Sequence, residues 1–232
     1  QNPHEDQEIA ENPSPNIPAQ TTTIFLADKP GAPQSVIKAG HLTIPINHPE
    51  YYSMNLLNYI FGGHPAARLF MNLRQDKGYS YGYYSSIDWS SGPSTFFAGG
   101  SVETKVTKES VVETLKEFED ISNKKPVSED EYKSSIEGIL MGFPARFESQ
   151  RQLLQQLSYQ TVFGLPDDYY SHFIDNLQAV NLPHLHSQAA EKIEPNNLIV
   201  LVVGDKAVVE PSLRELGLPI ISVDYDGNHI TQ

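Results

Sequence analysis

The sequence contains no cysteine, so neither a disulfide framework nor a thiolate metal site can form. A chain without cysteine suits the cytoplasm and the periplasm or cell envelope alike, which leaves the compartment undetermined. Basic residues are also scarce, because 16 Lys and Arg stand against 29 Asp and Glu and give a formal net charge of −13. Such a chain repels phosphates, so we expect no nucleic acid and no anionic membrane surface as its main partner.

Long apolar runs are missing as well. No stretch approaches the roughly 20 residues of a membrane span, and the N-terminus lacks a basic region followed by an apolar one. We therefore expect no membrane span. Because the chain begins with Gln1 rather than methionine, we expect it to be a processed or excised piece of a longer protein.

Two regions differ in composition. Residues 1–20 are polar and acidic and carry four prolines, a composition that cannot bury enough apolar surface to order itself. We predict a flexible linker there. Residues 21–232 contain the apolar periodicity of a folded domain, and a chain of this length can bury a substantial core.

Hydrophobic periodicity and turn residues predict the secondary structure of this domain. Strands are expected at 21–27, 34–46, 79–86, 93–104, 197–203 and 219–223, and helices at 48–61, 107–121, 128–142, 151–163, 167–177, 182–193 and 209–216. The continuous apolar run at 197–203 is typical of a strand buried on both faces. Ser128 and Glu131 form the pattern of a capping box at the start of a helix that Pro144 should kink or end near Gly142.

Residues 73–86 read LRQDKGYSYGYYSS and join a helix to a strand. Gly78 is predicted to end the helix, and the tyrosines that follow should alternate between the two faces of the strand. Tyr81 and Tyr83 then share one face, and Arg74 and Tyr81 converge on one cleft. A guanidinium and a phenol can together hold a peptide carbonyl or a developing oxyanion. Spacing alone favours the plainer alternative, a surface ion-pair arginine beside packed tyrosines.

This segment resembles the arginine–tyrosine motif of the pitrilysin/insulinase family of zinc metallopeptidases, in the C-terminal half that carries no zinc. That motif has a Gly-Gly turn, Arg-Leu, Leu-Arg, a glycine and a tyrosine seven residues after the second arginine, and the matching residues here are Gly62, Gly63, Arg68, Leu69, Leu73, Arg74, Gly78 and Tyr81. The resemblance to bacterial processing-peptidase-like members extends to 28–41, 163–170 and 202–205. It covers nearly everything from about residue 20 to the end of the chain.

The sequence lacks the residues for catalysis by this chain alone. Eight histidines are present, but none stands in His-x-x-Glu-His or in its mirror image. His184 and His186 come nearest to a ligand pair, yet side chains two positions apart point in roughly opposite directions on a helix. There is also no Gly-x-Ser-x-Gly elbow and no cysteine nucleophile. We therefore predict no metal site in this chain.

The resemblance implies a two-layer α+β fold, in which an antiparallel sheet of about five or six strands carries helices on one face. It also implies the substrate-binding, non-zinc half of a zinc-dependent peptidase, whose zinc lies in a partner domain or subunit of the same family. In that role Arg74 holds a backbone carbonyl of the peptide substrate, and Tyr81 donates its hydroxyl to the scissile carbonyl or its oxyanion. The isolated chain is expected to be inactive.

The alternative from the same family is a non-catalytic structural or assembly subunit. The presence of both Arg74 and Tyr81 favours the peptidase, since a purely structural relative has no need of that pair.

Overall fold

The computed structural model describes residues 21–230, and the linker predicted for residues 1–20 lies outside them. In this part of the chain six strands form one sheet in the order β3-β4-β2-β5-β1-β6. Their bounds are β1 (Thr23–Asp28), β2 (Gln34–Thr43), β3 (Ser80–Asp88), β4 (Ser94–Glu103), β5 (Ile199–Gly204) and β6 (Ile220–Val223). The α+β fold with about six strands is confirmed.

The direction of the strands refines the expectation of an antiparallel sheet. The pairs β3–β4, β4–β2 and β2–β5 are antiparallel, whereas β1 runs parallel to both β5 and β6. The sheet is therefore mixed, and the first strand of the chain lies between the last two. The prediction that β5 is buried on both faces is wrong, because its side chains alternate between buried positions and exposed or partly exposed ones. This alternation follows from a sheet that helices cover on one face only.

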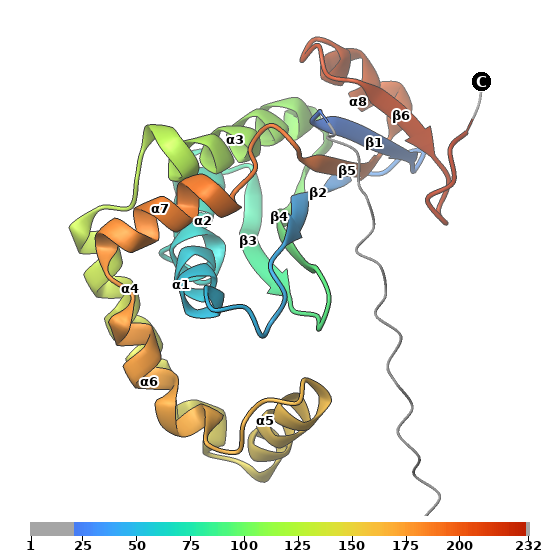
Figure 1. The fold of residues 1–232 in the computed structure, drawn as a ribbon. Helices are drawn as coiled ribbons and strands as arrows, with labels where there is room; N and C mark the ends of the chain where they lie inside the picture. Colours follow the sequence, from blue (N-terminus) through green and yellow to red (C-terminus); the bar gives the residue numbers. More distant parts are fainter. Residues whose placement is uncertain (1–20, 231–232) are drawn as a thin grey trace, which may run out of the picture.

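Helices α1, α2, α3 and α7 lie over one face of the sheet, and α4, α6 and α5 continue from this layer in an arc (Figure 1). The bounds are α1 (Tyr51–Gly62), α2 (Arg68–Phe70), α3 (Thr107–Glu119), α4 (Glu129–Gly142), α5 (Gln150–Val162), α6 (Tyr169–Ala179), α7 (Leu182–Lys192) and α8 (Lys206–Arg214). The predicted placement of helices on one face of the sheet is thus confirmed. Within residues 21–230, no helix combines the length and the apolar character needed to cross a bilayer.

The core lies between the sheet and its helical layer. Phe61 of α1, Phe96 of β4 and Phe118 of α3 are all fully buried. Their ring centres are 4.8 to 5.7 Å apart in tilted and edge-to-face arrangements, a geometry that adds roughly 0.5–1.5 kcal/mol per pair to the burial of the rings themselves. This aromatic cluster fixes α1 and α3 against the strands that carry the candidate site.

Local sequence signals correctly mark the bounds of helix α4. The Ser128 hydroxyl accepts a hydrogen bond from the backbone N–H of Glu131, and the Glu131 carboxylate accepts one from the N–H of Ser128 at 2.8 Å. The predicted capping box is confirmed, and it satisfies N–H groups that the first turn of a helix leaves unpaired. The helix ends at Gly142, just before Pro144, as predicted.

Candidate functional site

Arg74 and Tyr81 lie together where the helical segment enters the edge strand β3. Arg74 belongs to a π-helical turn, Met71–Asp76, that continues α2. Gly78 then adopts a φ of 67°, which favours glycine, and turns the chain into β3. The guanidinium carbon of Arg74 lies 5.6 Å from the centre of the Tyr81 ring, a cation–π contact. Tyr81 is 84% exposed, so its hydroxyl group is open to a ligand.

A β-bulge determines which tyrosines of β3 are exposed. The register of β3 against β4 shifts between Ser80 and Tyr83, so both of these residues face the core. Tyr83 is fully buried, its hydroxyl lies 2.8 Å from that of Thr114, and burial raises the pKa of Tyr83 far above its ordinary value. The prediction that Tyr81 and Tyr83 share a face is therefore wrong. Because the bulge adds a residue between the two core-facing positions, Tyr81 is directed to solvent.

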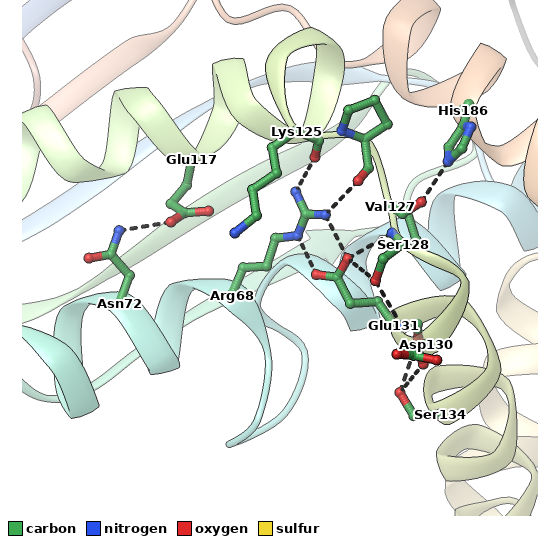
Figure 2. Close-up of polar contacts among 11 residues, drawn as sticks. Arg68, Asn72, Glu117, Lys125, Val127, Ser128, Asp130, Glu131, Ser134 and His186 are labelled. Atoms are coloured by element: carbon green, nitrogen blue, oxygen red, sulfur yellow. Dashed lines mark hydrogen bonds and ion pairs between the residues drawn. The ribbon is translucent and has the colours of Figure 1, made fainter.

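Arg68, in helix α2 just before the turn that carries Arg74, makes a network of hydrogen bonds to Glu131 and neighbouring backbone carbonyls (Figure 2). The buried Arg68 side chain donates from Nε and Nη2 to the two carboxylate oxygens of Glu131, at 2.7 and 2.9 Å, and from Nη1 to the Lys125 carbonyl at 2.7 Å. Burial favours a higher pKa for Glu131, but the hydrogen bonds from Arg68 and Ser128 outweigh it and lower this pKa to about 2. The pair therefore stays ionised at physiological pH and forms a bidentate clamp.

Asn72 anchors the same turn to α3. Its side-chain amide donates to the carboxylates of Glu113 and Glu117, at 3.0 and 2.7 Å, and the contact with Glu117 is drawn in Figure 2. Arg68 and Asn72 thus anchor the segment that leads to Arg74 to two different partners, Glu131 at the start of α4 and the carboxylates of α3. The sequence predicts Arg68 only as a member of the motif, and it gives no indication of the anchoring role of Asn72. The reason is that the partners of both side chains are dozens of positions away along the chain.

The histidines of the part of the chain that the structure describes do not gather into a metal site. Among residues 21–230, no three His, Asp or Glu side chains gather closely enough to hold a metal ion. His184 and His186 contact different partners, since the Nε2 atom of His184 lies 2.7 Å from a Glu50 carboxylate oxygen and that of His186 lies 2.7 Å from the Val127 carbonyl. A catalytic zinc ion needs about three protein ligands, and the residues of the described chain do not fit it.

The face of the sheet opposite the helices is partly apolar and open. Val36 and Leu42 of β2 and Ile199 of β5 are each between 39% and 46% exposed on it. Apolar side chains gathered on one face commonly mark a surface that another protein or a ligand covers.

The chain is similar to a known protein family and to several known proteins. A family model described as the peptidase M16 inactive domain matches residues 1–139. The uncharacterized zinc protease YmxG of Bacillus subtilis (strain 168) is 24% identical over 180 residues, which cover 76% of this chain and 43% of YmxG. The peptidase M16 inactive domain from Pseudomonas fluorescens superposes with a TM-score of 0.71 at 18% identity, over 79% of this chain and 44% of that chain.

The same fold occurs in a larger assembly. A chain of Complex III2 from Candida albicans superposes with a TM-score of 0.67 at 11% identity, over 84% of this chain and 49% of that chain. In all three comparisons the matched region spans less than half of the relative's length.

Proposed function

The chain belongs to the peptidase M16 inactive-domain family, and from this premise we propose that it is the substrate-binding half of a zinc-dependent peptidase. The zinc and the water that it activates belong to a partner domain or subunit of the same family. This chain contributes Arg74 and Tyr81 to the shared active site, and its substrate is a peptide or an unfolded segment. The resemblance of the sequence to pitrilysin/insulinase peptidases agrees with this family.

The observation that carries the proposal is the exposed stack of Arg74 on Tyr81. A tyrosine that is 84% exposed contributes little to the core, so packing does not explain its position. Arg74 sits on a turn whose backbone is anchored by Asn72 and, through the preceding helix α2, by Arg68, and Tyr81 sits at the start of β3. Donors that fixed elements position in advance need little reorganisation when they bind. Arg74 donates charge-assisted hydrogen bonds to a peptide carbonyl, and Tyr81 donates to the scissile carbonyl or its oxyanion.

The position of β3 supports a peptide as the ligand. This strand pairs with β4 on one side and forms the end of the strand order in the described sheet. The backbone groups of an edge strand can hydrogen-bond an extended peptide, and the side chains of that peptide then meet the neighbouring surface. Tyr81 is in this strand, so a peptide at the edge lies within reach of its hydroxyl.

The proposal is tested by mixing this chain with a zinc-bearing half and measuring peptide cleavage. Tyr81→Phe should lower kcat by roughly 100-fold and leave KM nearly unchanged, because a donor to the oxyanion acts in the transition state. The matched control is Tyr225→Phe, since Tyr225 is 79% exposed and lies beyond β6, at the opposite end of the strand order. Unchanged kinetics in Tyr81→Phe would rule out the oxyanion role.

The second candidate function is a non-catalytic structural or assembly subunit, and the fold that this chain shares with a chain of Complex III2 brings it into consideration. The same mixing experiment separates the two. A stable complex with the zinc-bearing half that cleaves no peptide would support the structural role, whereas restored cleavage supports the peptidase.

A further inference from the structure

A cavity of about 260 Å³ lies where helices α5 and α6 meet the far end of β3. Five aromatic side chains from four segments line it, namely Tyr51 at the start of α1, Trp89 just after β3, Tyr159 in α5, and Tyr169 and Tyr170 at the start of α6. Pockets for drug-sized ligands have volumes of about 300–1,000 Å³. This cavity therefore suits a smaller ligand, about the size of one amino-acid residue.

Four of these rings, those of Tyr51, Trp89, Tyr169 and Tyr170, pack against one another in series. The ring centre of Tyr51 lies 4.7 Å from that of Trp89 and 6.3 Å from that of Tyr169, and the rings of Tyr169 and Tyr170 are 4.9 Å apart. Aromatic rings prefer other rings in offset or edge-to-face geometry. The walls thus favour a flat, aromatic group.

The polar groups of the cavity are mostly hydrogen-bond donors. The Tyr169 hydroxyl is buried and makes no hydrogen bond of normal geometry among the described residues, although the phenol of Tyr51 lies close to it. Burial, and next the neighbouring Tyr51, raise the pKa values of Tyr159 and Tyr169, so both phenols keep their protons at physiological pH. A buried donor without a well-formed hydrogen bond is costly, and a ligand that brings an acceptor removes that cost.

Arg146 adds a positive charge to the same cavity. Its guanidinium carbon lies 5.2 Å from the centre of the Phe173 ring and 5.7 Å from that of Phe143, so cation–π contacts hold it in place. Arg146 takes part in none of the ion pairs formed among residues 21–230. No Asp or Glu lines the cavity, which leaves this charge available to an anionic ligand.

We propose that this cavity binds an aromatic residue with a free carboxylate, either the C-terminal residue of a peptide or a free aromatic amino acid. The ring of the ligand packs on Tyr51 and Trp89. Its carboxylate pairs with Arg146, and the Tyr169 hydroxyl donates to one of its oxygens. Nine residues line the site, and the charged guanidinium and the phenol and amide donors among them match the carboxylate of this ligand.

The site is separate from the pair of Arg74 and Tyr81. Tyr81 and Trp89 are eight positions apart along β3, which corresponds to roughly 25 Å in a strand. Occupation of the aromatic cavity therefore does not depend on the proposed peptidase role, and either proposal can fail without the other.

The cavity also connects α5 to the rest of the fold. No side chain of α5 is buried, and its link to α6 includes the hydrogen bond from the Tyr170 hydroxyl to the Gln156 carbonyl at 3.0 Å. A ligand that touches Tyr159 on α5 and Tyr51 on α1 bridges the two helices. Its binding should slow the hydrogen exchange of backbone amides at 150–162.

The test uses the tryptophan emission of the full chain, because Trp89 is its single tryptophan and lines the cavity. We expect saturable changes with a peptide that ends in phenylalanine and at least about tenfold weaker binding when its C-terminus is an amide, since a charge-assisted hydrogen bond is lost. A peptide that ends in alanine should bind weakly for lack of a ring. Tighter binding of the peptide than of free L-phenylalanine assigns the site to peptide C-termini, and the reverse order assigns it to the amino acid.

Two variants isolate the contacts. Arg146→Gln should abolish the preference for the acid over the amide, whereas Arg151→Gln, on an exposed arginine of α5 outside the cavity, should keep it. Tyr169→Phe should weaken binding and leave the thermal midpoint of unfolding unchanged or raised, because the hydroxyl that it removes makes no hydrogen bond of normal geometry. Equal affinity of the wild-type chain for acid and amide would overturn the proposal, and so would the absence of saturation or of slowed exchange at 150–162.

Discussion

Replacement of Arg68 by methionine should lower the free energy of unfolding by about 3 kcal/mol at neutral pH. Part of the magnitude follows from Glu131, whose pKa falls from 4.5 to about 2 in the fold through hydrogen bonds from both Arg68 and Ser128, and each unit is worth about 1.4 kcal/mol. Because the Glu131 side chain is 32% exposed, solvent screening reduces this contribution. The substitution also removes the donors to the carbonyls of Lys125 and Pro126, worth about 1 kcal/mol each, which offsets the reduction.

The effect of Arg68→Met should depend on pH in one direction. Glu131 has a lower pKa in the folded than in the unfolded chain, so its stabilisation is complete above pH 4.5 and is lost as the pH falls toward about 2. Arg68→Met should accordingly cost on the order of 1 kcal/mol less near pH 3.5 than near pH 7.

Urea denaturation of the variant and the wild-type chain at both pH values measures the two differences. The matched control is Lys133→Met, which breaks the exposed pair between Lys133 and Glu129 on the same helix, 2.6 Å apart, and should cost far less, because solvent screens an exposed ion pair. If Arg68→Met costs no more than this control, or costs the same at both pH values, then Arg68 does not hold Glu131 as an ionised partner.

Two further predictions concern packing and metal content. In urea denaturation, Gly62→Ala should cost about 1–3 kcal/mol because a methyl group there meets the backbone nitrogen of Ser85. A methyl group added at Gly142 has no atom within 4 Å, so Gly142→Ala should be neutral or stabilising by up to about 1 kcal/mol. If Gly62→Ala and Gly142→Ala changed the free energy of unfolding equally, the close approach of α1 to β3 would be contradicted. Metal analysis of the purified chain should find well under one zinc per chain. A stoichiometric zinc that resists chelators would contradict the prediction that this chain has no metal site.

Features set by sequence neighbours were predictable. The capping box of Ser128 and Glu131 involves residues three positions apart, and the end of α4 before Pro144 follows from the missing N–H of proline. The approach of Arg74 to Tyr81 likewise depends on one helical segment, Gly78 and the start of one strand. Hydrophobic patterns predicted the separate strands and helices, and the family resemblance added the expectation that the strands form one sheet with helices on one face.

Features set by contacts across the chain were not predictable in the same way. Alternation along β3 placed Tyr83 with Tyr81, but the register against β4 inserts a bulge, and one strand by itself cannot reveal its partner's register. The parallel pairing of β1 is set by β5 and β6 at the other end of the chain. The aromatic cavity combines five separate segments, none of which carries a local sign of a site.

The position of β1 between β5 and β6 has a consequence for synthesis on the ribosome. This strand emerges early, yet both of its edges stay unpaired until β5 and β6 have left the exit tunnel. Strands β2, β3 and β4 pair with one another and can assemble sooner. Pairing between distant segments is slow, and an unpaired apolar edge is open to neighbouring nascent chains. Completion of the sheet is therefore a late step, and a premature stop before β5 would leave the first strand without either of its neighbours.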